Sequence, residues 1–431
     1  MSQTNAPSVG AAAPAAAADV FRRIAWRVLP ILTIAFMVNF LDRINVGFAA
    51  LTMNHALGLT HAEFGIGAGV LFLGYTIFEL PSNIVLHRVG ARIWLARIMI
   101  TWGIVAMATM FVTGPRSFYG ARFLLGVAEA GFFPGAAYFL SEWFPVQYRA
   151  RIYAWFLMAI PIASIIGGPV SGALLHMHGF AGIAGWQWLY LIEGAPAILI
   201  GLFTLRLQDR PEQARWLTGE EQRLVRSALE GEVRDRPKHH LGAALSDVRV
   251  WMVALIQFSY TVGAYGVAIF LPMIIKAQHF SNLTTGWIYA FPSLLSCVAM
   301  VLWAGAVDRS RQKLLHLAAM CLISGLGLVL AVYAGSFALA FAGLTAVVIC
   351  TNAARAVLWT IPTRFLAGLG AAAGLAFINS IGTVGGFVGP SIMGWLRGAT
   401  GSFDAGLLAL SGFMFLSVAL VLVLRGFLTE Q

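Results

Sequence analysis

Ionisable side chains interrupt several long apolar stretches of this sequence. Asp42 and Arg43 are adjacent in the first stretch, and Arg122 and Glu129 lie seven residues apart in a later one. An ionisable group at the centre of a bilayer costs about 2.5–3.5 kcal/mol on insertion scales, so such a residue marks a functional site by default. These four residues are therefore the first candidates for chemistry.

The chemistry that these residue types favour is the binding of an anion coupled to the transfer of protons. The planar guanidinium of Arg43 can bind both oxygens of a carboxylate. Asp42 and Glu129 can carry protons, because the charge of a buried carboxylate depends on whether a cation or another anion lies beside it. A structural interpretation also exists, in which neutralised pairs only hold helices together. Glu79, nearer the end of its stretch, fits that interpretation better than Asp42 or Glu129 does.

The composition of the chain requires a membrane around these residues. Of its 431 residues, 59% are hydrophobic and 11% are charged, and the mean hydropathy is +0.81. Soluble domains are about 45–50% apolar and about 25% charged, so an integral membrane protein is expected, and disordered, collagenous and disulfide-scaffold classes are excluded. The three cysteines fall inside apolar stretches and are expected to be small buried residues rather than a metal site.

Twelve stretches are long and apolar enough to span a bilayer, which takes about 20 residues as an α-helix. They cover about 28–53, 63–86, 93–113, 118–141, 152–175, 187–205, 250–275, 284–306, 314–334, 337–362, 368–394 and 404–427. The expected fold class is an all-α membrane protein with twelve transmembrane helices. Its natural partner is the lipid bilayer.

Lysine and arginine residues indicate how the helices are oriented, because cytoplasmic loops carry an excess of them. Arg22, Arg23 and Arg27 precede the first span, which places the N-terminus in the cytoplasm. The even-numbered loops continue this excess, and an even number of spans returns the C-terminus to the same side. The net charge of +10 is therefore a topology signal, and no nucleic-acid partner is expected.

One long polar stretch, 206–249, divides the spans into six plus six. It holds nine Lys/Arg against eight Asp/Glu, and it is expected to be a linker with a charged surface helix. Forty-odd polar residues are too few for a catalytic domain with its own core. The expected organisation is a flexible tail over 1–20, a first bundle over 21–208, a cytoplasmic linker over 209–248 and a second bundle over 249–427.

Short matches at an offset of six spans indicate an internal duplication. The fourth span ends in Trp143-Phe144-Pro145 and the tenth in Trp359-Thr360-Ile361-Pro362. The fifth span carries Gly167-Gly168-Pro169, and the eleventh carries Gly385-Gly386 followed by Gly389-Pro390. Glycines spaced in this way let helix backbones approach closely, which suits helices that slide during a transport cycle as well as helices that simply pack.

At these residues the chain resembles the major facilitator superfamily, and within it the anion:cation symporter family. That family includes carriers of tartrate, phthalate, galactonate and glutamate, and the first half most resembles the tartrate-type bacterial permeases. The resembling stretches occur in both halves and in the family's order. They are Phe40-Leu41-Asp42-Arg43-Ile44-Asn45-Val46-Gly47, Tyr75 with Phe78-Glu79-Leu80-Pro81-Ser82-Asn83, Arg122-Phe123-Leu124-Leu125-Gly126 with Glu129-Ala130-Gly131-Phe132-Phe133-Pro134-Gly135, and Asn379-Ser380-Ile381-Gly382.

The resemblance implies two pseudo-symmetric six-helix bundles around a central cavity, with alternating access and proton coupling. It also implies roles for single residues. Arg43 and Asn379 would contact the substrate, with Tyr75 and Trp359 lining the site. Asp42 and Glu129 would carry protons, and Arg122 would pair with Glu129.

Two features bear on gating and on the substrate. The superfamily's loop motif after the second span, represented by Arg88 and Arg92, usually has an acid before the first arginine, but His87 stands there. This latch is expected to be weak or pH-sensitive, while the second half keeps the motif as Asp308-Arg309. Arg355 is less typical of the family. If its side chain reaches the cavity, a substrate with a second carboxylate is favoured.

The leading hypothesis is a proton-coupled symporter that imports a small organic anion, such as a tartrate-, phthalate- or sugar-acid-like carboxylate, across the bacterial inner membrane. One alternative exchanges phosphate or organic phosphate between Arg43 and Arg355, and another is a non-transporting membrane sensor. No enzyme activity, metal or cofactor besides the proton is expected, since no nucleophile–base or metal-ligand pattern occurs at membrane depth. A monomer suffices for all of these functions.

Overall fold

The computed structural model describes residues 12–233, 247–310, 312–362, 365 and 368–429. Within these residues every regular element is a helix, and twelve helical segments are long and apolar enough to cross a membrane. The predicted fold class and number of spans are confirmed, and the chain is a multi-pass membrane protein. Helices are the expected solution because each satisfies its own backbone hydrogen bonds where no water is present.

The first half of the chain forms the first six spans. They are built from α1 (Ala12–Leu57), α2 (His61–Val89), α3 (Ala91–Ala108), α4 (Pro115–Glu129), α5 (Phe132–Trp143), α6 (Val146–Leu157), α7 (Ala159–Leu174) and α8 (Gly185–Thr204). Of the tail expected over 1–20, residues 1–11 lie outside the described residues, and α1 already begins at Ala12. Alanine has the highest helix propensity and proline is tolerated in a first turn, so the segment 12–18 favours this extension.

The second half forms the remaining six spans and follows a linker helix. The linker helix is α9 (Gly219–Val233), and the spans are α11 (Val248–Lys276), α12 (Asn282–Ser310), α13 (Lys313–Tyr333), α14 (Phe337–Leu358), α15 (Gly368–Thr400) and α16 (Asp404–Thr429). Four single-turn helices, Thr109–Phe111, Leu175–Met177, Phe180–Gly182 and Pro211–Gln213, complete the connections in the first half and the start of the linker.

The fourth span is broken in its middle, between α4 and α5. Gly131 at the break has φ +86°, a conformation that side chains rarely adopt. A Cβ there would also lie 2.5 Å from the Ser82 hydroxyl, which donates a 2.6 Å hydrogen bond to the carbonyl of Ala130. Glycine is therefore required at this position, and the break leaves Glu129 as the last residue of α4.

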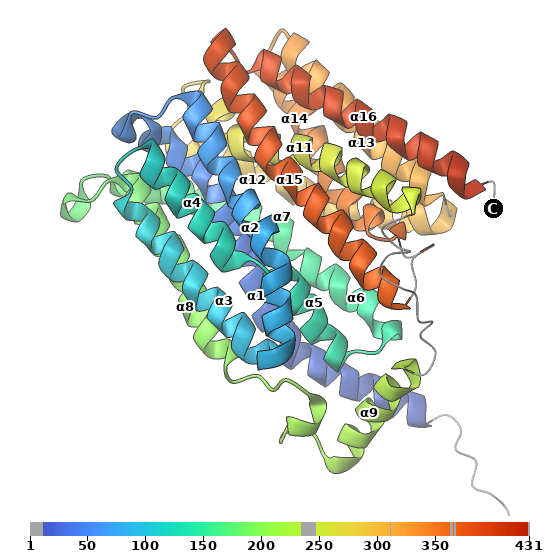
Figure 1. Ribbon diagram of the computed structural model, residues 1–431. Helices are drawn as coiled ribbons and strands as arrows, with labels where there is room; N and C mark the ends of the chain where they lie inside the picture. The colour runs from blue at the N-terminus through green and yellow to red at the C-terminus, as the bar shows by residue number, and fades with distance from the viewer. Residues whose placement is uncertain (1–11, 234–246, 311, 363–364, 366–367, 430–431) are drawn as a thin grey trace, which may run out of the picture.

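Two pairs of helices provide most of the contact between the two halves (Figure 1), and α1 also packs against α11. In the first pair α2 packs against α15, and in the second α7 packs against α12. In order along the chain, these are the second span with the eleventh and the fifth with the eighth. Replacing each span by its counterpart six spans away turns the first pair into the second and the second pair into the first. Such reciprocal contacts are those of two copies of one unit across a two-fold axis, as the internal duplication predicts.

Glycines bring these helix pairs into backbone contact. At Gly168 in α7 an added Cβ would lie 2.6 Å from the carbonyl oxygen of Gly286 in α12. At Gly69 in α2 an added Cβ would lie 2.7 Å from the carbonyl oxygen of Phe387 in α15. Side-chain carbons do not approach carbonyl oxygens so closely, so larger residues would separate the halves. The contacts lie towards the loops that precede α2 and α12, and they close that end of the molecule.

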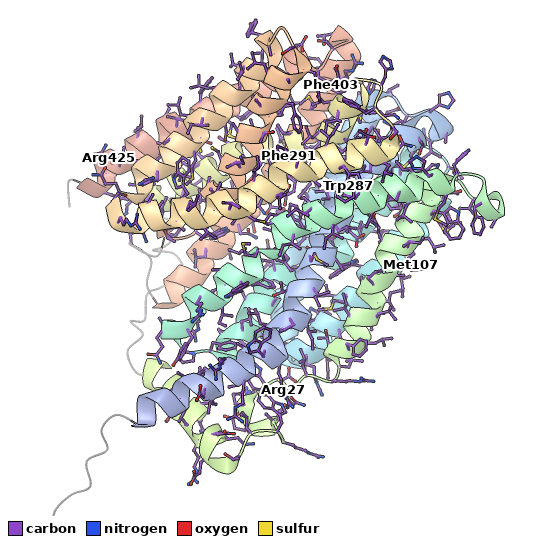
Figure 2. The ribbon with its side chains drawn as sticks, turned by 180° about the vertical axis from the view of Figure 1, so that it is seen from behind. Arg27, Met107, Trp287, Phe291, Phe403 and Arg425 are labelled. Atoms are coloured by element: carbon purple, nitrogen blue, oxygen red, sulfur yellow. The ribbon has the colours of Figure 1, made fainter. Side chains whose placement is uncertain are left out.

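The linker packs against the first half at the opposite end. The indole of Trp216 stacks on that of Trp143 with ring centroids 5.9 Å apart, and the guanidinium of Arg27 lies 4.7 Å from the Trp216 ring. Figure 2 shows Arg27 where α1 passes this part of the linker. Leu217 and Val225 are buried in the same contact. The charged linker expected over 209–248 therefore has an apolar face that holds it to the first bundle.

The outer surface of the spans is apolar, as a lipid environment requires. Trp287 and Phe291 on α12 expose 62% and 51% of their surface and project outward from the molecule (Figure 2). In lipid such residues need no protein partner. All three cysteines are unpaired, and two of them, Cys321 and Cys350, are buried as expected for small apolar residues.

Candidate functional site

A cavity of about 690 Å³ lies between the two halves. All five residues that the sequence predicts for substrate binding line it, and they come from both halves: Arg43, Tyr75, Arg355, Trp359 and Asn379. They lie on α1, α2, α14, the turn after α14 and α15, up to 336 positions apart in the sequence (379 minus 43). All five therefore face one space between the halves, and their roles remain predictions.

Arg43 is the cation of this cavity that has a carboxylate partner. Its Nε atom lies 3.0 Å from Oε2 of Glu129, and only 11% of its side chain is exposed. The guanidinium also lies 4.8 Å from the centre of the Tyr75 ring, a distance at which the ring face stabilises a cation. Arg43 lines the cavity, where an anion could meet its guanidinium.

Glu129 is fully buried at the break of the fourth span. The sequence analysis paired it with Arg122, but the structure pairs it with Arg43 instead. Residues seven apart on one helix are separated by about 10 Å along its axis, too far for a direct ion pair, whereas α1 brings Arg43 to the end of α4. The second carboxylate oxygen of Glu129, Oε1, has no hydrogen-bond partner among the described residues.

Asp42 and Arg122 lie behind the cavity, inside the first bundle. The Trp102 indole donates to Oδ2 of Asp42 at 2.8 Å, and the Asn45 amide donates to Oδ1 at 3.2 Å. Arg122 is completely buried and donates to the backbone carbonyls of Asp42 and Ala68 at 3.5 and 3.4 Å. Neither residue lines the cavity, and their roles in proton transfer remain predictions.

Four polar residues of α11 line the cavity, and the sequence analysis missed all of them: Gln257, Tyr260, Thr261 and Tyr265. The guanidinium of Arg355 lies 5.9 Å from the centre of the Tyr265 ring. Gln257, two turns earlier on the same face, is 93% buried and its side-chain oxygen has no partner in the described part of the chain. The sequence contained a signal for these residues. Polar side chains recur at helical spacing in an otherwise apolar span and form a stripe on one face of the helix: Gln257, then Tyr260 or Thr261, then Tyr265.

Glu193 in α8 is another buried acid that the sequence analysis did not single out. It is 4% exposed and accepts a 2.6 Å hydrogen bond from Ser171 on its Oε1. It lies in the apolar window 187–205 and met the same criterion as Glu79, an acid at membrane depth. Glu193 lies outside the cavity but within electrostatic range of Asp42.

The predicted gating residues lie at the linker end of the molecule. Arg92 forms a contact within its own half, where its backbone N–H donates to Oδ1 of Asp209 at 2.7 Å and its Nε lies 3.7 Å from Oδ2. Arg88 and Arg309 are exposed. The side chain of Asp308 lies outside the described residues. The arginines of the loop motif that the structure describes, Arg88, Arg92 and Arg309, therefore do not join one half of the molecule to the other.

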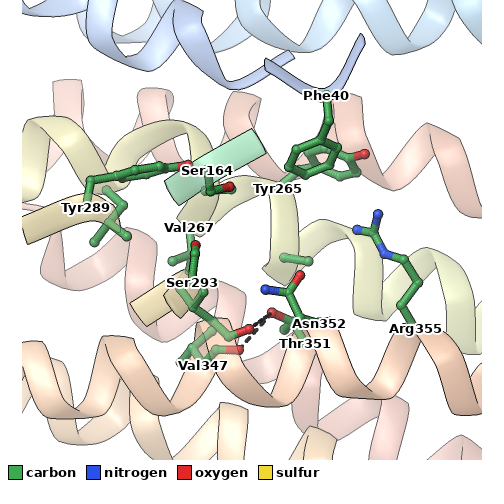
Figure 3. A pocket seen from close by; sticks show the side chains of 14 residues that line it. Phe40, Ser164, Tyr265, Val267, Tyr289, Ser293, Val347, Thr351, Asn352 and Arg355 are labelled. Atoms are coloured by element: carbon green, nitrogen blue, oxygen red, sulfur yellow. Dashed lines mark hydrogen bonds between the residues drawn. The ribbon is translucent and has the colours of Figure 1, made fainter. Parts of the chain in front are cut away.

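A second cavity of about 550 Å³ opens beside the first, inside the second half and against α1 and α7. Arg355 and Tyr265 line both cavities. The walls of the second cavity carry several small polar side chains, which are labelled in Figure 3: Ser164, Ser293, Thr351 and Asn352. Among the described residues, no group of three or more His, Cys, Asp or Glu could hold a metal ion.

Comparison with known proteins places these features in a family. The model of a family described as the Major Facilitator Superfamily matches residues 32–390. An Agrobacterium vitis protein named "Putative tartrate transporter" is 48% identical over 410 residues, which cover 94% of this chain and 91% of that protein. The "Quinolone resistance transporter" of Acinetobacter baumannii is 39% identical over 419 residues, 96% of each chain.

Solved structures show the same fold. A bacterial homologue of the human lysosomal transporter Spinster, described in an inward-facing and occupied conformation, superposes with a TM-score of 0.77. The match covers 94% of this chain and 98% of that one, at 18% sequence identity. The arrangement of the twelve spans is therefore that of a known transporter fold.

Proposed function

Because this chain belongs to the Major Facilitator Superfamily, we propose that it carries a small organic anion across the membrane together with protons. The observation that supports this proposal most is the Arg43–Glu129 ion pair at the wall of a cavity between the two halves. It joins the residue type that binds carboxylates to the residue type that carries protons. The similarity to a protein named a tartrate transporter points to the same class of substrate.

The proposed coupling is a competition for one cation. When a substrate carboxylate binds Arg43, the attraction between Arg43 and Glu129 is shared with the new anion. Glu129 is fully buried, so a carboxylate that loses its counter-ion there is strongly destabilised and takes up a proton. Substrate binding and protonation of Glu129 thus favour each other, and by linkage each raises the affinity for the other.

The geometry also supports alternating access. The glycine contacts of α2 with α15 and α7 with α12 close one end of the cavity, while the linker packs on the first half at the other end. Under the predicted topology the closed end faces outward, and this conformation delivers substrate to the cytoplasm. We propose that the same helix pairs separate in the opposite state, in a bacterial inner membrane.

Transport by purified protein in liposomes tests the proposal. Wild-type protein should accumulate labelled tartrate or a related acid when the interior is alkaline, and it should exchange internal for external substrate without a gradient. Glu129→Gln should retain exchange and lose accumulation, because a neutral amide cannot release a proton. Glu142→Gln, a partly exposed acid at the linker end, serves as the control. Undiminished pH-driven accumulation by Glu129→Gln would exclude Glu129 as the proton carrier.

One rival function is supported by a specific observation. Arg43 and Arg355 come from opposite halves and line the same cavity, so phosphate could be held between them. Liposomes loaded with phosphate separate the two proposals. A phosphate exchanger requires internal phosphate for uptake and ignores the pH gradient, whereas a symporter responds to the gradient with no internal anion. A sensor would show neither activity.

A further inference from the structure

We propose that the second cavity is a subsite for the distal end of the substrate, so that the protein selects dianionic hydroxy acids. In this arrangement Arg43 binds one carboxylate, Arg355 binds the other, and polar side chains of the second cavity bind hydroxyl groups between or beside them. The inference rests on the proposed function, since it names the class of organic anion that the same site accepts. Three observations carry it.

The first observation is the charge of Arg355. Among the described residues no carboxylate forms an ion pair with it, whereas Arg43 has Glu129. Its electrostatic neighbours are the hydroxyls of Tyr260 and Tyr265, and its guanidinium lies 5.9 Å from the ring centres of Phe40 and Tyr265. A cation at membrane depth without a counter-ion is costly, and an arriving anion removes that cost.

The second observation is the junction between the cavities. Tyr265 lines both of them, and the guanidinium of Arg355 lies 5.9 Å from the centre of its ring. Its ring packs against Phe72 with centroids 4.5 Å apart, which fixes its position in the wall. Arg43 and Arg355 both line the first cavity, so the two ends of one small molecule can face the two guanidiniums. Figure 3 shows Arg355 extended toward Tyr265 at one side of the second cavity.

The third observation is the polar wall of the second cavity. Ser293 is 3% exposed and lines this cavity. The Asn352 amide nitrogen donates to Ser296 at 3.2 Å, which leaves its carbonyl oxygen for a donor in the cavity. Buried polar groups normally have partners, and in a binding site the ligand supplies them. Hydroxyl groups can both donate and accept, so they match a serine beside an amide oxygen.

Matched pairs of acids test the inference. The members of each pair differ in having one carboxylate or two: threonate and tartrate, galactonate and galactarate, benzoate and phthalate. Binding to purified full-length protein would be measured by calorimetry. We expect the dicarboxylate of a bound pair to bind more tightly than its monocarboxylate. A charge-assisted hydrogen bond corresponds to roughly 10- to 100-fold in affinity.

Variants then locate the effect. Arg355→Gln should reduce the affinity for the dicarboxylate to about that of the monocarboxylate and leave the monocarboxylate unchanged. Arg397→Gln, another membrane-helix arginine that lines neither cavity, is the matched control and should alter neither. Ser293→Ala should weaken tartrate by roughly 2- to 10-fold and leave succinate, which lacks the hydroxyls, unaffected. This second variant tests the subsite even if Arg355→Gln does not fold.

The outcomes are distinct. Equal wild-type affinity for both members of every bound pair would overturn the second subsite while leaving the organic-anion proposal intact. The second subsite would also be overturned if Arg355→Gln lost affinity equally for both members of a pair. It would be overturned as well if Arg355→Gln lost only the binding of phosphate. Failure of all six acids to bind would refute the organic-anion proposal itself.

Discussion

The Asn379 side-chain amide donates a 2.6 Å hydrogen bond to Oε1 of Glu79, and this bond joins α15 to α2 across the two halves of the molecule. Glu79 is 5% exposed, and its other carboxylate oxygen has no partner among the described residues. Asn379 lines the cavity, so Glu79 holds the amide that a substrate carboxylate would use. If Asn379 binds the substrate as predicted, the substrate competes with a carboxylate that belongs to the protein.

Glu79→Gln is expected to strengthen substrate binding. The amide keeps an oxygen for Asn379 and removes a negative charge near the incoming anion. Repulsion between two carboxylates about 5 Å apart is up to about 3 kcal/mol at an effective dielectric of 20, and we expect roughly tenfold tighter binding after screening. Calorimetric titration measures the effect. Glu63→Gln, an exposed capping acid on the same helix, should bind as wild type. Unchanged or weaker binding by Glu79→Gln would show that Asn379 and Glu79 do not face the substrate.

The Arg43–Glu129 pair allows stability and binding to be separated. Arg43→Ala should abolish substrate binding and should also lower the free energy of unfolding by about 3–5 kcal/mol, because it leaves Glu129 buried without a counter-ion. The double variant Arg43→Ala/Glu129→Gln should recover most of that stability but no binding. Thermal unfolding in detergent and ligand titration are the two measurements. Recovery of wild-type affinity by the double variant would remove Arg43 from the site.

Glu193 provides a contrast with Glu129. It lines neither cavity, and its Oε2 has no hydrogen-bond partner in the described part of the chain. An unpaired charge so deep in a membrane protein is expensive, so we expect the carboxyl group to stay protonated throughout the cycle. Glu193→Gln should then keep both uptake and the ratio of protons to substrate, measured from reversal potentials in liposomes. A lower ratio would make Glu193 a second proton carrier.

The close contact of Gly286 with Gly168 predicts a conformational effect. A methyl group at Gly286 would meet the Gly168 backbone, including its carbonyl oxygen, and lie 3.0 Å from Cα of Pro169. Gly286→Ala should keep α7 and α12 apart and reduce transport at least fivefold. Gly305→Ala, on the same helix with open space around it, is the matched control. Both changes gain about 1 kcal/mol of helix propensity, so only the steric effect differs.

Spin-label distances between α7 and α12 report the result directly. Gly286→Ala should lengthen them relative to wild type, and Gly305→Ala should not. An unchanged distribution in Gly286→Ala, with normal transport, would show that the halves do not need this contact to close.

The sequence alone determined the number of spans and the type of chemistry. Both follow from local quantities: about 20 apolar residues must form a helix in lipid, and a charge within such a run must be used or neutralised. For this reason Asp42, Arg43 and Glu129 stood out without any structure. Glu193 was available to the same argument and was overlooked.

Only the tertiary structure decided which of these residues meet. The family resemblance implied that Arg122 pairs with Glu129, but the partner is Arg43, which approaches from α1. The packing of Tyr265 against Phe72 and the bond from Asn379 to Glu79 connect opposite halves of the chain. Periodicity specifies which face of its own helix a residue occupies, whereas a site between bundles depends on how two separately formed helix surfaces pack together. That packing is set by glycine contacts and side-chain shapes far apart in the sequence, and no local pattern encodes it.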